Sequence, residues 1–335
     1  MDLRSLPKIE LHLHLDCSLS YAAVSRLAPH VTREEYDREF VAPARCTNLA
    51  DFLSRAPKGF QLMQTEDSLR LVTEDIFAQL AQDGVVYAEI RFAPLLHTQK
   101  GLTPERVVAV VENATDQLTR ATGIEAGLIL CTLRHFTEEQ SMATVHLVEQ
   151  FYGSRFLALD IAGDEAGFPL EAHIGAYRYA REHGLSRTAH AGEACGPESV
   201  WETLRQLEPQ RIGHGTRSIE DPALVEHLRK ERIHLELCPS SNVQIIPSIL
   251  SWAHHPIDRL FRAGVSLSVS TDTRMLTPAT LTGEFEGLQR TFGWSAEQFL
   301  RTNQMGVEAA FADASVKDRV RKRLAEAYGA LGSAE

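Results

Sequence analysis

Eight short apolar stretches, spread along nearly the whole chain, constrain the fold most strongly. Each is typical of a buried parallel strand and is followed by a helix-like or loop segment. The stretches are Ile9 to Leu15, Val85 to Ala93, Ala126 to Leu133, Phe156 to Ile161, Arg187 to His190, Arg211 to Gly213, His234 to Cys238 and Val265 to Ser270. Eight such units predict an α/β protein with a closed (β/α)8 TIM barrel, whose functional site lies at the carboxyl ends of the strands.

An open doubly wound sheet is the alternative architecture, and it calls for a glycine-rich turn after an early strand. The first stretch is followed by Asp16-Cys17-Ser18-Leu19-Ser20, which is no such turn. The chain has 335 residues and shows no repeat or linker that marks a boundary. We therefore predict a single barrel domain over residues 1–335.

The longest interval between two predicted strands runs from Cys17 to Gly84. It contains apolar residues at helical spacing, for instance Leu69, Val72 and Ile76, so it predicts helices rather than a loop. We expect a helical, lid-like insertion at about residues 17–84, over the mouth of the barrel. Ser315 to Leu331 is amphipathic and predicts a closing helix, with Ser315 as a candidate cap.

Composition narrows the range of partners. The net charge of −11 disfavours nucleic acid or an anionic membrane, and a small neutral or cationic ligand fits it better. Five scattered cysteines without a Cys-x-x-Cys pair argue against a disulfide framework or a cysteine-rich zinc site. The N-terminus lacks an apolar leader and no stretch is long enough to span a bilayer, so we expect a cytoplasmic protein. The sequence does not indicate an oligomeric state.

His12 and His14 lie two residues apart in the first stretch, so a strand places both imidazoles on one face. Burying two imidazoles together is costly unless a partner satisfies both, and a metal ion does so. Taken alone, the pair is also typical of polar positions on a half-exposed strand.

Further ionisable residues follow other predicted strands. His190 and Glu193 come at the end of the fifth stretch, His214 after the sixth and Asp272 after the eighth. Each of them alone has an ordinary structural explanation, such as a buried hydrogen bond or a helix cap. In a barrel, however, these strand ends face one pocket. We therefore predict a zinc site, since Zn²⁺ accepts imidazole nitrogen and carboxylate oxygen. Its predicted ligands are His12, His14, His190 and Asp272.

This set of residues predicts metal-assisted hydrolysis. Zinc lowers the pKa of a bound water to about 7 and so supplies hydroxide at neutral pH. His214, outside the ligand set, can orient that water and stabilise its charge. Glu193 can donate a proton to a substrate atom that becomes basic during attack.

The chain also resembles adenosine deaminase and its close relatives in the amidohydrolase superfamily. The motifs that carry the resemblance are Pro7-Lys8-Ile9-Glu10-Leu11-His12-Leu13-His14-Leu15-Asp16, Asp160-Ile161-Ala162-Gly163-Asp164-Glu165, His190-Ala191-Gly192-Glu193, Arg211-Ile212-Gly213-His214-Gly215, Cys238-Pro239-Ser240-Ser241-Asn242 and Ser270-Thr271-Asp272. The resemblance implies a mononuclear zinc barrel that hydrolyses the 6-amino group of a purine and releases ammonia. It implies the same four zinc ligands, with Glu193 as the donor to purine N1 and His214 as the residue that positions the attacking hydroxide. Asp272 would also hydrogen-bond that hydroxide.

The resemblance further implies substrate contacts. The backbone N–H of Gly163 would meet purine N3, where the missing side chain permits close approach. Asp16 would meet the ribose 5′-hydroxyl, although it could also cap the segment that follows it. Two positions depart from the family pattern: Cys17 replaces a glycine, and Thr273-Arg274 replaces Asp-Pro. The second aspartate of that pattern bonds purine N7, and the hydroxyl of Thr273 can still donate there.

Adenosine and 2′-deoxyadenosine are the first candidate substrates. Deaminases of adenine, methylthioadenosine, aminodeoxyfutalosine and N6-modified AMP are alternatives that share the barrel. AMP itself is disfavoured because Asp16 would repel a phosphate. If the barrel were non-catalytic, we would expect a metal ligand or the acid to be missing, whereas the four ligands, Glu193 and His214 are all present. Related binuclear barrel hydrolases often bridge two ions with a modified lysine on the fourth strand, and Leu157 to Gly163 contains none, which favours one zinc per chain.

Overall fold

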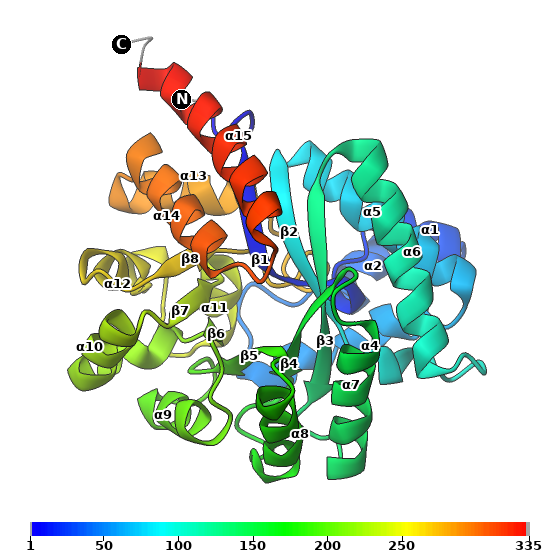
Figure 1. Ribbon diagram of the computed structural model, residues 1–335. Helices are drawn as coiled ribbons and strands as arrows, with labels where there is room; N and C mark the ends of the chain where they lie inside the picture. Colours follow the sequence, from blue (N-terminus) through cyan, green and yellow to red (C-terminus); the bar gives the residue numbers. More distant parts are fainter. Residues whose placement is uncertain (1, 333–335) are drawn as a thin grey trace.

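The computed structural model describes residues 2–332, so Met1 and residues 333–335 of the predicted domain span lie outside the described part. Its eight strands are parallel, and each pairs with the next one in chain order. Helices surround this sheet on the outside (Figure 1). The predicted (β/α)8 barrel is confirmed.

The strands lie close to the predicted stretches because runs of apolar residues are buried on both faces. Their bounds are β1 Lys8–His14, β2 Val85–Phe92, β3 Glu125–Leu133, β4 Phe156–Ala162, β5 Ser186–Ala191, β6 Arg211–His214, β7 His234–Leu237 and β8 Leu267–Val269. The last strand is shorter than predicted. The N–H of Val265 still bonds the carbonyl of Leu260, so this residue belongs to the turn that precedes β8.

Most helices begin at a polar capping residue, for example Thr32, Thr65 and Thr137, whose side chains accept backbone N–H groups. The α-helices are α1 Tyr21–Leu27, α2 Arg33–Glu39, α3 Leu49–Leu53, α4 Ala56–Phe60, α5 Glu66–Gln82, α6 Pro104–Thr122, α7 Glu138–Phe151, α8 Glu171–Glu182, α9 Pro197–Gln206, α10 Pro222–Glu231, α11 Pro239–Ile245, α12 Ile257–Arg262, α13 Leu281–Phe292, α14 Ala296–Ala309 and α15 Ala314–Gly332. Short 3-10 turns are η1 Leu15–Cys17, η2 Pro94–His97, η3 Thr216–Glu220 and η4 Trp252–His254.

The barrel closes where the chain beyond β8 meets β1. The N–H of Asp272 donates to the carbonyl of His12 at 3.0 Å, and the N–H of His14 donates to the carbonyl of Asp272 at 2.8 Å. Asp272 adopts a left-handed backbone with φ of 68°, an uncommon conformation for a residue other than glycine. Closure of the barrel itself therefore places Asp272 between the two histidines of β1.

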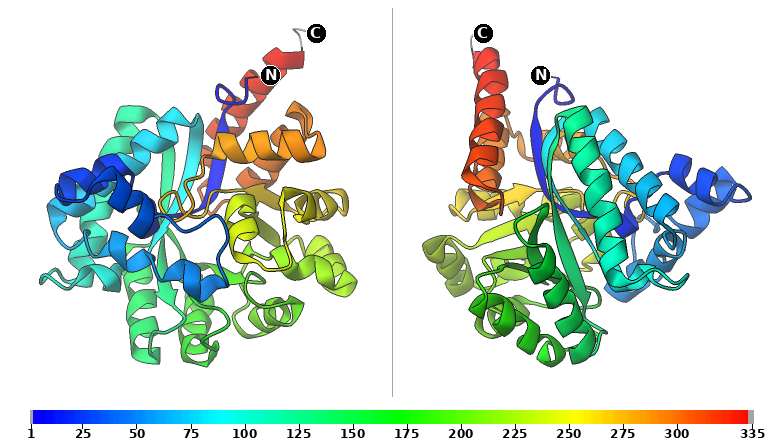
Figure 2. Two further views of the ribbon diagram at one scale, coloured as in Figure 1. Left: turned by 180° about the vertical axis from the view of Figure 1, so that it is seen from behind. Right: turned by 45° about the vertical axis from the view of Figure 1, so that its right-hand side comes forward.

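Among the helices between β1 and β2, α5 differs in position from α3 and α4, and α1 contacts α5 and α2. Helix α5 buries an apolar face that includes Leu69, Val72 and Phe77, and it packs against α6 and β2 as part of the outer ring. Helices α3 and α4 instead lie across the barrel (Figure 2, left), and their residues line the cavity described below. The segment at the mouth is thus smaller than the whole interval 17–84.

Helix α15 packs against α14, and the N-terminus of the chain lies beside it (Figure 1). It begins at Ala314, so Ser315 lies in its first turn and is not the cap. The carbonyl of Asp313 accepts the N–H groups of Val316 and Lys317 instead. None of the helices in residues 2–332 is both long and apolar enough to cross a membrane.

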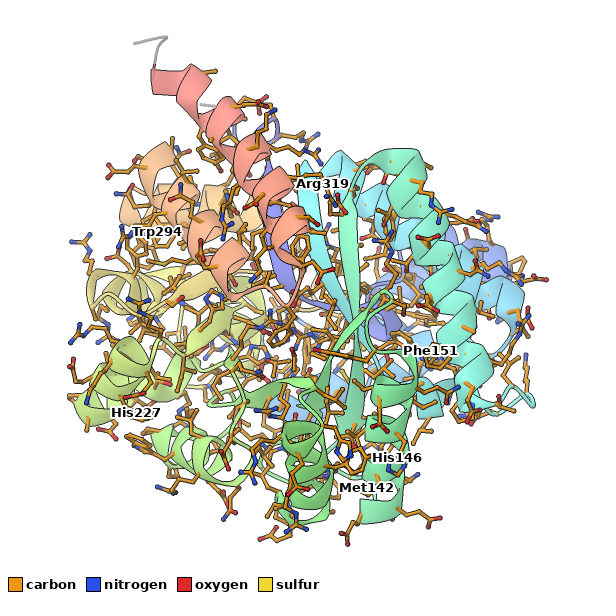
Figure 3. All side chains as sticks on the ribbon, viewed as in Figure 1. Met142, His146, Phe151, His227, Trp294 and Arg319 are labelled. Carbon is orange, nitrogen blue, oxygen red and sulfur yellow. The ribbon has the colours of Figure 1, made fainter. Side chains whose placement is uncertain are left out.

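Aromatic side chains fill the space between the outer helices. Trp294, in the turn between α13 and α14, contacts the rings of Phe261 and Phe299 with centroids 5.0 and 5.8 Å apart (Figure 3). Its indole N–H donates to Asp258 at 2.9 Å. These contacts join α12 and α14 to the turn that follows α13.

Glu284 on α13 provides a pH-dependent stability prediction. Its carboxylate is buried and accepts the N–H of Ser240 at 3.2 Å, and burial raises the pKa of Glu284 from 4.5 to about 8. Between these values the folded protein binds more protons than the unfolded chain, so stability falls as the pH rises. Each unit of pKa difference corresponds to about 1.4 kcal/mol. We expect Glu284→Gln to become increasingly stable relative to the parent between about pH 5 and pH 8, measured by urea unfolding. If the difference in unfolding free energy between the two proteins did not change with pH, the raised pKa of Glu284 would be contradicted.

Candidate active site

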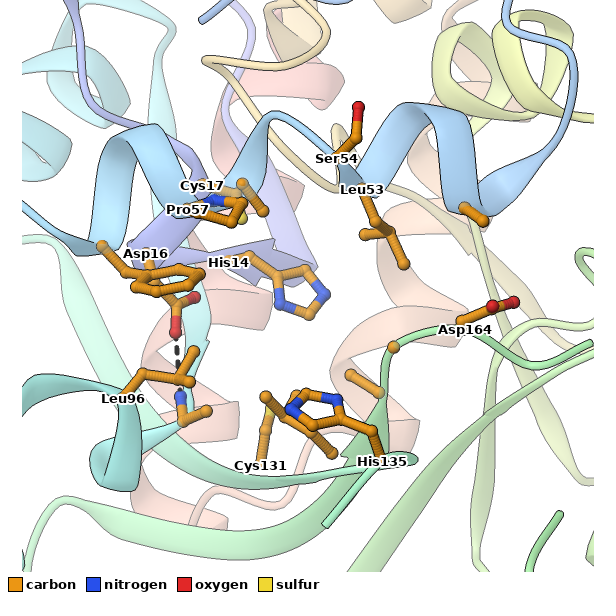
Figure 4. A pocket seen from close by; sticks show the side chains of 17 residues that line it. His14, Asp16, Cys17, Leu53, Ser54, Pro57, Leu96, Cys131, His135 and Asp164 are labelled. Atoms are coloured by element: carbon orange, nitrogen blue, oxygen red, sulfur yellow. Dashed lines mark hydrogen bonds between the residues drawn. The ribbon is translucent and has the colours of Figure 1, made fainter. Parts of the chain in front are cut away.

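A cavity of about 440 Å³ opens at the carboxyl ends of the strands, beneath α3 and α4 (Figure 4). His14, Asp16 and Cys17 form one wall, and Leu133 and His135 form another. A smaller recess next to it is lined by His190, Glu193, His214, Asp272 and Thr273, among others. The strand ends predicted to converge from the sequence therefore do meet in one place.

Three imidazoles and a carboxylate face one another in the recess. The candidate ligand atoms of His12, His14 and His190 all lie within 4.8 Å of one another. His14 Nε2 is 3.1 Å from His190 Nε2, and Asp272 Oδ1 lies 3.4 Å from His12 Nε2 and 3.5 Å from His14 Nε2. The structure brings together all four predicted zinc ligands.

Buried carboxylates orient two of these imidazoles. His12 Nδ1 lies 2.8 Å from Glu236, and His190 Nδ1 lies 3.2 Å from Asp160. When each Nδ1 carries the proton, each Nε2 presents a lone pair to the recess, as in metal sites whose histidines bond a carboxylate. Arg91 donates to both carboxylates, at 2.8 Å to Asp160 and 2.6 Å to Glu236. This ion network lies inside the barrel, directly beneath the recess.

We did not predict roles for Arg91, Glu236 or Asp160 from the sequence. The signal was present, because each is a charged residue within an apolar strand, and a buried charge requires a partner. Burial alone would raise the pKa values of both carboxyls. His190 and Arg91 lower the pKa of Asp160 below its usual range, and Arg91 and Arg211 do the same for Glu236. Both groups are therefore anionic and can orient the histidines.

The donor set fits a divalent cation. His12 Nε2 is fully buried and has no hydrogen-bond partner among the described residues. Burial lowers the pKa of His14 to about 3, so this ring is neutral. Burial opposes ionisation of Asp272, but His12 and His214 outweigh it and lower the pKa of that carboxyl. Three imidazole nitrogens and one anionic oxygen are ligands that zinc accepts.

His214 is held in one tautomer. Thr216 donates to the amide oxygen of Asn242 at 2.7 Å, so the amide nitrogen faces His214 Nδ1 at 3.2 Å. Burial, followed by the neighbouring His12, lowers the pKa of His214 well below its usual value. The ring is therefore neutral, with its proton on Nε2, which points into the recess 3.5 Å from Glu193. Asn242 belongs to a motif that we had noted without assigning this role.

Glu193 is a weaker acid than an exposed glutamate. Its side chain is buried, and Oε1 has no partner among residues 2–332. Burial, together with the charges of Asp272 and Glu165, raises the pKa of Glu193 well above its usual value. A protonated carboxyl in this position can donate to a ligand bound in the recess.

The remaining predicted residues line the two cavities. Asp16 accepts the N–H of Ala93 at 2.9 Å (dashed in Figure 4), so it does not cap the segment that follows it; Ser20 caps α1. Gly163 has φ of 100°, where a side chain would be strained. Thr273 accepts the N–H of Thr277 at 3.2 Å, which leaves its hydroxyl proton for another acceptor.

Arg274, which stands where the family pattern has a proline, has structural partners. It donates to Glu10 at 2.7 Å and to Asp83 at 3.1 Å. Glu10 also accepts the N–H and the hydroxyl of Thr271. Glu10 thus connects Thr271, before Asp272, with Arg274, after it. Arg274 is not among the residues that line the cavity.

Comparisons with known proteins agree with this architecture. The sequence model of the family described as Adenosine deaminase matches residues 7–327. An adenosine deaminase of Clostridium acetobutylicum is 31% identical over 96% of this chain and 97% of its own. The crystal structure of an adenine deaminase from Arthrobacter aurescens has a TM-score of 0.88 and 27% identity, covering 96% of this chain and 98% of that chain. A Burkholderia amidohydrolase solved with bound Zn has a TM-score of 0.89 and 23% identity, covering 99% and 93% of the two chains, and supports the fold.

Proposed function

The chain belongs to the adenosine deaminase family, and on this basis we propose that it hydrolyses the 6-amino group of adenosine or 2′-deoxyadenosine and releases ammonia. One observation carries the proposal. The cluster of His12, His14, His190 and Asp272 lies beside Glu193, a carboxyl with a raised pKa, at the inner end of a cavity of about 440 Å³.

We assign one zinc ion to each chain, held by these three histidines and Asp272. When bound, zinc lowers the pKa of a coordinated water to about 7 and supplies the nucleophile. A single ion is favoured because β4 carries no lysine to bridge a second one.

The protein groups divide the remaining work. Glu193 donates its proton to purine N1, which makes C6 more electrophilic. The Nε2–H of the neutral His214 ring would donate a hydrogen bond to the attacking oxygen and so stabilise the negative charge on it. Asp272 accepts a hydrogen bond from the same oxygen.

Substrate contacts follow from the walls of the cavity. We propose that the N–H of Gly163 meets N3, the hydroxyl of Thr273 meets N7 and the carboxylate of Asp16 meets the ribose 5′-hydroxyl. The pKa of Asp16 is lowered by His97 and by the N–H of Ala93 in spite of its burial, so the residue is an acceptor. No lysine or arginine is among the residues that line the cavity, which disfavours a phosphate at this end.

Replacing Asp16 tests the ribose contact. Asp16→Ala removes the acceptor for the 5′-hydroxyl, and a lost hydrogen bond to a charged group is worth about 1.5–3 kcal/mol. We expect KM for adenosine to rise about tenfold or more, with little change for adenine, which lacks the sugar. Steady-state kinetics on both substrates measure the difference. An equal rise for the two would exclude this contact.

A 5′-modified adenosine is the second candidate, and one feature of the cavity favours it. Its lining also includes Phe60, Leu96 and Leu133, an apolar surface well suited to a substituent at that position. Methylthioadenosine and aminodeoxyfutalosine carry such substituents.

A substrate screen distinguishes these possibilities. Ammonia release is followed from adenosine, 2′-deoxyadenosine, adenine, AMP, methylthioadenosine and aminodeoxyfutalosine. We expect the highest kcat/KM for the two unmodified nucleosides and the lowest for AMP. A preference for a 5′-modified compound would support the second candidate, and no release from any of them would favour a non-catalytic barrel. The cytoplasmic location stays a prediction from the sequence.

A further inference from the structure

The barrel is weakly paired between β4 and β5. The two strands share two register pairs, Ala158 with Ser186 and Leu159 with Arg187, near the start of β5. His190 and Glu193 lie further along, beyond the end of this ladder. On its other side β5 pairs with β6 as far as Ala191, and Arg217 donates to the carbonyls of Gly192 and Ala194. On the β4 side, side-chain contacts must fix the loop that carries Glu193.

Glu165, just beyond β4, makes those contacts. Its Oε1 accepts the N–H of Gly192 at 2.7 Å, and its Oε2 accepts the N–H groups of Glu193, Ala194 and Cys195 at 3.1, 2.7 and 2.9 Å. The hydroxyl of Ser199 completes the set at 2.6 Å from Oε1. One carboxylate thus accepts four consecutive backbone N–H groups of the loop.

The guanidinium groups of Arg134 and Arg217 interact with the charge of this carboxylate without direct contact. Within residues 2–332, no lysine or arginine nitrogen forms an ion pair with Glu165, which is 7% exposed. Its direct partners are hydrogen-bond donors, and charge-assisted bonds of this kind are about twice as strong as neutral ones. Gly192 has φ of 71°, and its own N–H is one of the four donors. The backbone therefore turns after β5 so that its N–H groups point toward Glu165.

We propose that Glu165 is a positioning residue for the deamination reaction: it fixes the loop 192–195 so that the carboxyl of Glu193 faces the recess. The proposal rests on the proposed function of Glu193. The same geometry has an electrostatic consequence, because the charge of Glu165 contributes, after burial and Asp272, to the raised pKa of Glu193.

Glutamine at this position cannot reproduce the arrangement. Its amide offers one oxygen, and its NH2 group would confront backbone N–H donors that have no other acceptor. Misplacement of a catalytic group by about 1 Å can reduce turnover about 10²-fold. The zinc ligands and the walls around the substrate do not depend on this carboxylate, so binding should survive.

The experiment compares Glu165→Gln with the parent in zinc content, KM, kcat and amide hydrogen exchange of the peptide that holds residues 192–195. We expect unchanged zinc content, KM within about threefold, kcat lowered about 10²-fold and faster exchange in that peptide. Asp221→Asn is the matched control, since Asp221 also accepts a backbone N–H, from Ala223 at 2.9 Å, and an indole N–H, from Trp201 at 2.8 Å. It should lose stability but keep kcat.

An unchanged kcat in folded Glu165→Gln, or a loss no larger than that of Asp221→Asn, would overturn the proposal. Hydrogen exchange separates this failure from failure of the proposed function, because it requires no activity. Unchanged exchange at residues 192–195 refutes the anchoring whatever reaction the protein catalyses. If the glutamine variant does not fold, the same measurements are made on Glu165→Asp. It keeps the charge but is one methylene shorter, and we expect a smaller loss of kcat in the same direction.

Discussion

Glu193→Gln should bind zinc as the parent does and lose about 10²–10⁴-fold in kcat, the usual range for removal of a general acid. The amide is nearly isosteric with the carboxyl but has no proton to transfer to N1. Because Glu193 must be protonated to act, parental activity should also fall as the pH rises through its raised pKa. Steady-state kinetics and metal analysis measure both effects.

Glu202→Gln on α9 is the control, since Glu202 is an exposed glutamate near the same loop. It should leave kcat and zinc content unchanged. Full activity in Glu193→Gln would remove this residue from catalysis. Loss of zinc in that variant would instead make Glu193 part of the metal site.

The second large effect is expected for His214→Ala. This variant removes the neutral Nε2–H that stabilises the attacking oxygen, and losing one such donor costs about 10²–10³ in kcat. Zinc should stay bound, because its four proposed ligands, the three histidines and Asp272, are unchanged. His146→Ala, on the exposed surface of α7, is the control that should behave as the parent.

Zinc analysis of this variant tests the ligand assignment. Ligand atoms of His12, His214 and Asp272 also lie within 4.8 Å of one another, so the geometry permits His214 in the ligand set. Loss of zinc from His214→Ala would place it there. We assign it outside because its Nε2 proton, fixed by Asn242, occupies the atom that a metal would need.

The barrel could be predicted from the sequence because its strands are short apolar runs buried on both faces. The candidate site could be predicted because His12, His190 and Asp272 stand at strand ends, which a closed barrel brings together. The interval 17–84 was less predictable. Helical periodicity is the same for α5, which belongs to the outer ring, and for the helices at the mouth.

The residues that orient the site were harder to identify. A charge within an apolar strand, such as Arg91, shows that a partner exists but does not say which one. Glu165 and Asn242 act through loop geometry, and sequence spacing contains no information about which N–H or ring atom they meet. The role of Arg274 likewise depends on Asp83, which is distant in the sequence and adjacent only in the fold.

A zinc titration of metal-free protein, with ammonia release from adenosine as the readout, tests a mononuclear zinc deaminase most directly. Activity should be absent without metal and should rise linearly to a plateau at about one equivalent of zinc per chain. Full activity without metal, or a rise that continues to a second equivalent, would contradict the mononuclear mechanism.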